Sequence, residues 1–236
     1  MNEVSSAPST NRSMNRIPAP EDNGLGEVAH RPTAALAYAA VIDPILGAVH
    51  RRTAQMCIQA GAEVVLDIGS ATGVQCRNLD AAGVHATGLD LSEVMIRWAR
   101  RHSRASIRYV LGSALDLPFA EGSFDAAVLV LALHEHTESE RQTMLHEACR
   151  VVRAAGTLVL AEYVVPRHLT RDPAWWIVRT IERIAGGSHY AGFVDFVELG
   201  GMIGLLQRSD LTATEEQRLC GGAIGAVRIP IHHRVT

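Results

Sequence analysis

The sequence predicts an α/β fold in which a mostly parallel sheet is covered by helices on both faces. Apolar runs typical of buried strands alternate with helical patterns between about residues 64 and 163. The first apolar run ends in an acid followed by a turn of small residues, as at the start of a nucleotide-type domain. Hydrophobic residues make up 47% of the 236 residues and charged residues 20%, so the chain can bury a sizeable core.

The N-terminal region is predicted to contain a tail and a helical part. Residues 1–27 are rich in Ser, Asn, Pro and Gly and are expected to be disordered, which leaves 28–236 as a single domain. Apolar residues recur at helical spacing over 34–60, and Pro44 is expected to separate two helical segments.

The central turn follows the first predicted strand and reads Val-Val-Leu-Asp-Ile-Gly-Ser-Ala-Thr-Gly over residues 64–73. Small residues let the backbone approach a ligand closely, and the helix predicted from Val74 offers its N-terminal N–H groups to that ligand. A dinucleotide fingerprint would need glycines at positions 69, 71 and 74, but the chain has Gly69, Ala71 and Val74.

The acid-x-Gly-x-Ala-x-Gly spacing resembles motif I of the class I S-adenosylmethionine (SAM)-dependent methyltransferases, which is usually D-x-G-x-G-x-G. A tight turn without a ligand is the alternative interpretation. The resemblance implies that the following residues shape the turn on the methionine side of the cofactor: Asp67, Gly69, Ser70, Ala71 and Gly73.

The second predicted strand, 84–89, ends in Asp90, about twenty residues beyond the glycine turn. A Rossmann-like domain places an acid there to bind ribose hydroxyls, so Asp90 and the adjacent Leu91 are candidate cofactor residues. An ordinary turn role is the alternative for Asp90. Ser92 is expected to cap a helix over 93–102.

The third strand, 107–111, is followed by Gly-Ser-Ala-Leu-Asp-Leu-Pro-Phe over residues 112–119. This segment resembles the methyltransferase motif G-D-A-x-x-L-P-F, whose polar second residue and following backbone bind the adenine. Ser113 replaces the acid, and a hydroxyl meets the adenine amino group more weakly than a carboxylate does. The resemblance implies that Ser113 and Ala114 bind adenine.

The fourth strand, 123–131, is fully apolar and therefore predicted to be central. Its carboxyl end brings Leu131 to the cofactor and presents His134, Glu135 and His136 to the crevice where such sheets bind ligands. His134 matches an L-H-x stretch of the resembling group. His134 and Glu135 are the candidate catalytic residues, as bases or orienting groups, and His134 is also a candidate substrate contact. The alternative is that one binds cofactor or backbone while the others face solvent.

A helix over 138–152 and a strand over 157–163 follow. Their sequence, EACRVVRAAGTLVLAEY, resembles E-x-x-R-V-L-K-P-G-G-x-L-x-x-x-E. Four motifs in order identify the chain as a member of the class I methyltransferases, similar to the ubiquinone/menaquinone-biosynthesis-like group. The resemblance implies a Rossmann-like seven-stranded sheet, S-adenosyl-L-methionine as cofactor, S-adenosyl-L-homocysteine as product, and methyl transfer to a small-molecule acceptor.

Two final strands near 211–216 and 223–229 would complete the sheet with an antiparallel edge strand. Before them, the segment 164–200 is expected to form a helical lid on the substrate, beginning with a helix from Pro173. Core packing is the alternative for its aromatic residues and for Tyr38. The candidate substrate residues, besides His134, are Tyr38, Trp176, His189 and Tyr190.

Composition excludes several other functions. A net charge of −3 argues against a nucleic-acid partner, and no apolar stretch reaches the ~18 residues of a membrane span. Four cysteines without paired spacing indicate reduced thiols and a cytoplasmic protein. His232 and His233 lack a third ligand, so no metal is expected. An exposed Trp175/Trp176 lid would favour a homodimer.

Two other functions stay open. A nicotinamide-dependent oxidoreductase is disfavoured by the missing GxGxxG and by the lack of any Y-x-x-x-K. A SAM-binding module without transferase activity shares every cofactor residue with the enzyme, so only an activity measurement separates the two.

Overall fold

The computed structural model describes residues 32–166, 173–185 and 187–232, and its seven strands form one sheet in the order β3-β2-β1-β4-β5-β7-β6. Strands β1 to β5 are parallel to one another, whereas β7 runs antiparallel to both β5 and β6. The antiparallel strand thus lies at one end of the sheet, next to the outermost strand β6, and the predicted fold class is confirmed. The strands are β1 (Val64–Ile68), β2 (His85–Asp90), β3 (Arg108–Leu111), β4 (Phe124–Val130), β5 (Val152–Tyr163), β6 (Glu215–Leu219) and β7 (Ile224–Pro230).

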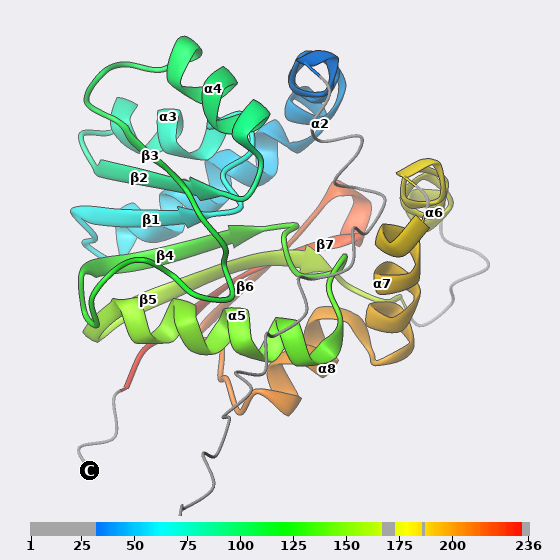
Figure 1. Ribbon diagram of the computed structural model, residues 1–236. Coiled ribbons are helices and arrows are strands. Elements are labelled where there is room, and N and C mark those ends of the chain that lie inside the picture. Colours follow the sequence, from blue (N-terminus) through cyan, green and yellow to red (C-terminus); the bar gives the residue numbers. More distant parts are fainter. Residues whose placement is uncertain (1–31, 167–172, 186, 233–236) are drawn as a thin grey trace, which may run out of the picture.

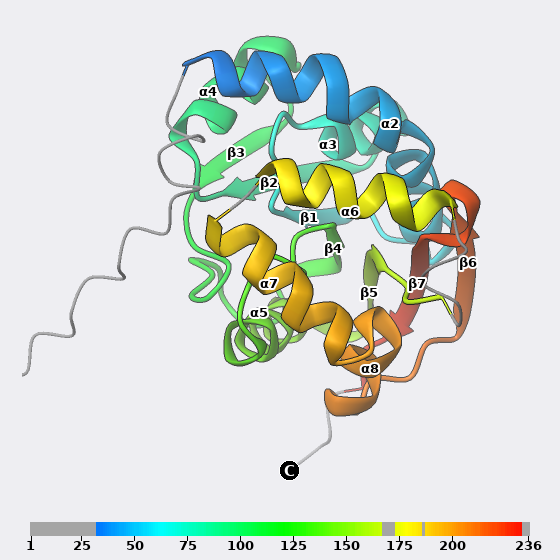
Figure 2. The same ribbon diagram turned by 90° about the vertical axis from the view of Figure 1, so that its right-hand side faces the viewer.

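Helices cover both faces of the sheet and the edge at which the parallel strands end. Figure 1 shows α2, α3 and α4 on one face and α5 and α8 on the other. Figure 2 shows α6 and α7 crossing in front of the carboxyl ends of β1, β4 and β5. The helices are α2 (Pro32–Gln59), α3 (Val74–Ala81), α4 (Glu93–His102), α5 (Glu138–Val151), α6 (Pro173–Ala185), α7 (Gly187–Glu198) and α8 (Gly201–Arg208), with a short 3-10 turn η1 (Cys220–Gly222).

The two central strands carry the core. The side chains of 126–129 in β4 are fully buried, as are Val65, Leu66 and Ile68 in β1, because helices cover both faces. The chain leaves β1 toward β2 on one side, while β4 lies on the other side of β1. The strand order therefore reverses between β1 and β4, and ligands bind α/β sheets at the carboxyl ends of the strands beside such a reversal.

Two boundaries differ from the sequence-based expectation. Pro44 lies inside one continuous helix α2, so the predicted division at this residue is wrong. Leu46 and Val49 beyond the proline are buried like Ala35 before it, and this tertiary packing compensates for the hydrogen bond that proline removes. Strand β6 begins at Glu215 rather than near 211, and its side chains are exposed or half-buried, so an apolar run could not mark it.

Arg141 of α5 is fully buried and joins the turn after β4 to the lid helices. Its Nε donates to the carbonyl of Leu133 at 3.2 Å, and its Nη2 donates to the carbonyl of Gly192 at 2.8 Å. Its Nη1 lies 2.8 Å from Asp195 Oδ2, and its guanidinium lies over the Phe196 ring. Charge-assisted bonds of this kind are stronger than neutral ones, so α7 is fixed to α5.

Candidate active site

The turn after β1 has a backbone that few residues adopt. Gly69 and Gly73 have φ angles of 77° and 83°, and Ala71 between them has φ 42°. Left-handed conformations cost an L-residue roughly 1–2 kcal/mol, and such strain is concentrated at functional sites. The structure therefore confirms the close turn, and Ala71 adopts the conformation for which the usual motif has glycine.

Asp90 fixes this turn from the end of the neighbouring strand. Its Oδ2 accepts from the Ala71 N–H at 2.8 Å, and its Oδ1 accepts from the Ser92 N–H at 2.8 Å. Burial raises the pKa of Asp90, and these two hydrogen bonds oppose the shift. The structure thus places the predicted ribose acid directly against the glycine turn, while the adjacent Leu91 is 73% exposed.

Tyr109 of β3 supports the turn from behind, a role that the sequence reading missed. A Cβ on Gly73 would lie 2.2 Å from the Tyr109 hydroxyl, and one on Gly88 would lie 2.7 Å from its ring. The hydroxyl also lies 2.9 Å from Ser103 Oγ. Two glycines, at 73 and 88, therefore make room for one tyrosine ring beneath the turn.

Asp67 lies at the base of the turn and is 2% exposed. The thiol of Cys76 in α3 donates to its Oδ2 at 3.4 Å, so this acid joins the strand to the helix that follows. Burial raises the pKa of Asp67 to about 7, against a weaker opposing contribution from the Cys76 hydrogen bond.

We expect Asp67→Asn to flatten the pH dependence of stability between pH 5 and pH 8. Because the folded-state pKa of about 7 exceeds the ordinary value of 3.8, the folded chain binds the extra proton in this range, and stability falls as pH rises. Asparagine stays neutral, so between pH 5 and 8 the wild type should lose about 1–3 kcal/mol more unfolding free energy than the variant. Urea unfolding at four pH values measures this; parallel curves for both proteins would contradict it.

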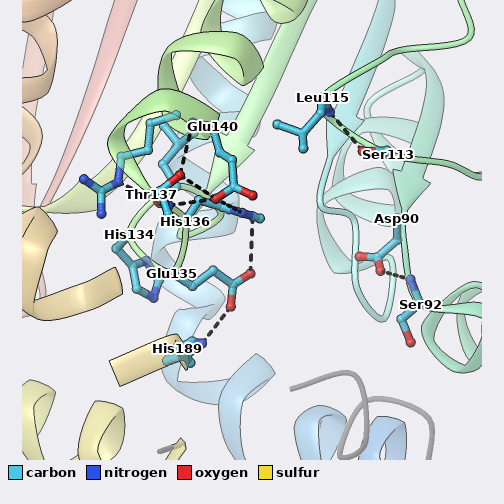
Figure 3. A network of polar contacts seen from close by, with 12 residues as sticks. Asp90, Ser92, Ser113, Leu115, His134, Glu135, His136, Thr137, Glu140 and His189 are labelled. Carbon is cyan, nitrogen blue, oxygen red and sulfur yellow. Dashed lines mark hydrogen bonds and ion pairs between the residues drawn. The ribbon is translucent and has the colours of Figure 1, made fainter. Parts of the chain in front are cut away.

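The loop after β3 contains the predicted adenine residues. Ser113 Oγ accepts from the Leu115 N–H at 3.1 Å and thus stabilises the loop itself (Figure 3). Ala114 packs against the core as a half-buried side chain. Leu131, at the end of β4, adopts a positive φ of 51° and donates its N–H to the Ala161 carbonyl at 2.8 Å.

Glu147 and Arg150 of α5 anchor this loop, which explains the E-x-x-R part of the sequence motif. Glu147 Oε2 accepts from the Leu117 N–H at 2.8 Å. Arg150 donates to the carbonyls of Phe119 and Leu117 at 2.8 and 3.0 Å, and it is paired with Glu147 at 2.7 Å. The position of the loop after β3 therefore depends on a helix some thirty residues away in the chain.

Arg150→Ala is expected to raise the dissociation constant for S-adenosylhomocysteine by about 5–10-fold, because two backbone carbonyls lose a charged donor and the loop loosens. Arg153→Ala is the matched control, since Arg153 pairs at 2.5 Å with Asp125 at the start of β4. Calorimetric titration of both variants measures the effect. Equal affinity in the two variants would mean that the loop does not contribute to cofactor binding.

A second polar group lies across the crevice from Asp90, at the end of β4 (Figure 3). His134 is 3% exposed; its Nδ1 lies 3.2 Å from Glu162 Oε2, and its Nε2 lies 3.6 Å from Glu182 Oε1. Glu162 also accepts from the Leu133 N–H at 2.7 Å. Burial alone would lower the pKa of His134, but the adjacent carboxylates outweigh it and raise that pKa.

His189 of α7 completes this group, so the helical segment after β5 reaches the residues that follow β4. Its Nδ1 lies 2.7 Å from Glu135 Oε2, and its Nε2 lies 2.5 Å from Glu182 Oε2. Burial would lower the pKa of His189, yet hydrogen bonds to Glu135 and Glu182 raise it to about 9. Tyr163 donates its hydroxyl to Glu182 Oε1 at 2.6 Å. We refer to His134, Glu135, Glu162, Glu182 and His189 as the His/Glu cluster.

Tyr38 of α2 is half-buried. Burial raises its pKa, and the charges of Asp43, Glu135, Asp90 and Asp67 add to the shift. A role for Tyr38 as a lid residue stays a prediction.

The remaining predicted substrate residues lie outside the His/Glu cluster. Tyr190 packs with its ring 6.1 Å from that of Phe193. Trp176 is 62% exposed whereas Trp175 is 1% exposed, so the two tryptophans face opposite ways as expected. The structure does not bring Trp176 to the cluster.

Glu182 was missed by the sequence reading, although the sequence carries a signal for it. Trp175, Val178 and Glu182 follow at spacings of three and four and share one face of α6. All three side chains are buried. An acid such as Glu182 on the apolar face of a helix indicates that it has a buried partner, because an unpaired buried charge is costly.

Comparison with known proteins supports this description. Residues 66–160 match the family model for a methyltransferase domain. A demethylmenaquinone methyltransferase from Tropheryma whipplei (strain Twist) is 35% identical over 120 residues, which are 50% of this chain and 49% of that protein. One from Thermotoga maritima is 31% identical over 118 residues, 49% of this chain and 50% of that protein. The chain thus spans about half the length of these relatives.

Solved structures share the fold at low sequence identity. Human N-acetylserotonin methyltransferase in complex with SAM superposes with a TM-score of 0.66 at 13% identity, covering 91% of this chain and 61% of that one. The N-methyltransferase NodS from Bradyrhizobium japonicum, in complex with S-adenosylhomocysteine, gives 0.63 at 16% identity, covering 90% of this chain and 100% of that one.

The residues present fit an adenosyl cofactor. The Ser70 hydroxyl at the turn is buried without a hydrogen-bond partner among the described residues. Apolar side chains after β2 and in the loop after β3 are accessible, with Leu91 73% and Leu115 36% exposed. The fold, the match of residues 66–160 to the methyltransferase-domain family and the similarity to demethylmenaquinone methyltransferases together support a class I methyltransferase domain with S-adenosyl-L-methionine as its cofactor.

Proposed function

We propose that the chain transfers the methyl group of SAM to a nucleophilic atom of a small-molecule acceptor by in-line displacement. The observation that carries the proposal is that Asp90, which binds the glycine turn, faces the residues of the His/Glu cluster across the ends of the strands (Figure 3). Such a reaction mainly requires the donor and acceptor to be held about 3 Å apart with water excluded. Helices α2, α6 and α7 lie over the strand ends and would supply that cover (Figure 2).

We propose His134 and Glu135 as the groups that orient the acceptor and receive its proton where the acceptor must lose one. The acceptor itself is the least determined part, since the fold does not specify it. Relatives named demethylmenaquinone methyltransferase make demethylmenaquinone the first acceptor to test. A cytoplasmic location and a homodimer stay predictions from the sequence; among the described residues, no helix is long and apolar enough to cross a membrane.

Calorimetric titration with SAM, S-adenosylhomocysteine and NAD tests the cofactor, and mass spectrometry of S-adenosylhomocysteine formed with a panel of acceptors tests the transfer. We expect binding of both sulfur compounds, none of NAD, and product with at least one acceptor. Binding without product from any acceptor would favour the SAM-binding module. Binding of NAD alone would favour the oxidoreductase.

A further inference from the structure

The His/Glu cluster has an arrangement of nitrogen and carboxylate oxygen atoms that suits a bound cation as well as a network of ion pairs. Each histidine directs Nδ1 toward its own carboxylate, His134 toward Glu162 at 3.2 Å and His189 toward Glu135 at 2.7 Å. Both Nε2 atoms then face the same third carboxylate, that of Glu182, at 3.6 and 2.5 Å. Carboxylates on Nδ1 are the usual outer partners of metal-binding histidines, because they fix the ring and its tautomer.

The tautomer decides what can lie between the rings and Glu182. If each Nδ1 carries the proton donated to its carboxylate, each Nε2 has a lone pair directed at an oxygen of Glu182, which also has lone pairs. Two like lone pairs repel unless a proton or a cation lies between them. Tyr163 already donates its hydroxyl to Glu182 Oε1 at 2.6 Å, so this oxygen has its own donor.

The charge of the cluster also favours a cation. Glu162 is fully buried and Glu182 is 3% exposed, and with Glu135 they place three carboxylates around two imidazoles. With both rings neutral the five side chains carry three negative charges, and with both doubly protonated they still carry one. Buried charge is costly unless it is paired or coordinates a metal.

We propose that His134 Nε2, His189 Nε2 and a carboxylate oxygen of Glu182 form a binding site for a divalent transition metal of the Zn²⁺ type. The three ligand atoms lie within 4.8 Å of one another, and tetrahedral zinc needs them about 3.4 Å apart, so side-chain shifts of about 1 Å close the site. Two imidazoles and one carboxylate are a ligand set that zinc takes in sites with a further open position.

This site is contrary to the expectation that the chain binds no metal, which considered only His232 and His233. Two of the three ligands come from the lid helices and one from the end of β4, so the cation would join the lid to the sheet. Binding of the cation is measured without methyl transfer, and with the cation bound His134 Nε2 would be a ligand, so that Glu135 alone would receive the acceptor's proton. The cation's further role, offering an open position to an oxygen or sulfur of the acceptor, rests on the proposed function.

For the test, the full chain is first freed of metal by chelation and desalting. It is then titrated with ZnCl₂ in a calorimeter and, separately, with Co²⁺ in an absorption spectrometer. We expect one Zn²⁺ per chain and the visible absorption of four- or five-coordinate Co²⁺. Glu182→Gln and His189→Gln should each weaken Zn²⁺ binding at least about 100-fold, and Glu135→Ala, which removes only the partner of Nδ1, about 10-fold. His85→Gln, an exposed histidine at the start of β2, is the control and should bind as the wild type does.

The same variants are also titrated with S-adenosylhomocysteine in the absence of metal. Binding shows that each variant is folded, and it tests the proposed function separately from the metal site. Zinc binding without S-adenosylhomocysteine binding would overturn the proposed function and leave the metal site standing. A wild type that takes up no zinc would overturn the metal site, and so would zinc affinity that Glu182→Gln and His189→Gln leave unchanged. The cluster would then be a network of two imidazolium and three carboxylate groups.

Discussion

Asp90→Ala should abolish useful cofactor binding, with a dissociation constant for S-adenosylhomocysteine at least about 100-fold above that of the wild type. The variant leaves the N–H groups of Ala71 and Ser92 without their acceptor, and each bond to a charged acceptor contributes about 1.5–3 kcal/mol. It also removes the acid proposed to bind the ribose. A hundredfold change corresponds to about 2.8 kcal/mol, so losing these bonds accounts for it without a change of fold.

Calorimetric titration measures this effect, and Asp80→Ala is the matched control. Asp80 is also an acid with a local hydrogen bond, from Ser106 Oγ at 2.7 Å, but it lies in α3 away from the crevice. Wild-type affinity is expected for Asp80→Ala. If Asp90→Ala bound S-adenosylhomocysteine within about threefold of the wild type, the assignment of the cofactor side would be wrong.

Gly73→Ala should be among the most destabilising glycine-to-alanine substitutions in the chain, and we expect it to lower the free energy of unfolding by about 2–5 kcal/mol. The left-handed φ of 83° costs an L-residue about 1–2 kcal/mol, and the new Cβ would lie 2.2 Å from the Tyr109 hydroxyl. Overpacking of this kind adds about 1–3 kcal/mol. For a chain of this length we expect the midpoint of thermal unfolding to fall by about 10 °C.

The chain offers a matched control for that prediction. Gly83 has a φ of 82° and nothing within 4 Å of a Cβ, so Gly83→Ala should show the backbone strain without the clash. Combining Gly73→Ala with Tyr109→Phe, which removes the clashing oxygen, should recover part of the loss in a double-mutant cycle. Equal losses of unfolding free energy in Gly73→Ala and Gly83→Ala would show that a Cβ at position 73 does not clash with Tyr109.

The cofactor side of the site could be predicted from sequence because it is built from local patterns. Asp67, Gly69 and Gly73 lie within one turn, and Asp90 ends the next strand, so strand order alone brings them together. His134 could be predicted for the same reason, since the apolar run of β4 after Asp125 ends at Val130, four residues before it. In each case the residue is placed by the end of a strand that hydrophobicity reveals.

The acceptor side could be predicted only in part, because its contacts join distant segments. His134 meets Glu162 and Glu182 across 28 and 48 positions, and no local pattern specifies which side chain of a lid helix turns inward. The anchoring of the loop after β3 by Glu147 and Arg150 was missed for the same reason. Edge strand β6 escaped correct placement because an exposed strand has no apolar run to mark it.

Glu162, Glu182 and His189 all lie beyond residue 160, where the match to the methyltransferase family model ends. The segment proposed to bind the methyl donor therefore lies within the family match, while much of the proposed acceptor side comes from a different stretch of the chain. Substitutions in α6 and α7 can then alter which compounds are accepted while the donor pocket stays constant. Selectivity for the acceptor and affinity for the methyl donor can therefore change independently, either by natural variation or by replacing α6 and α7 with the corresponding helices of another protein.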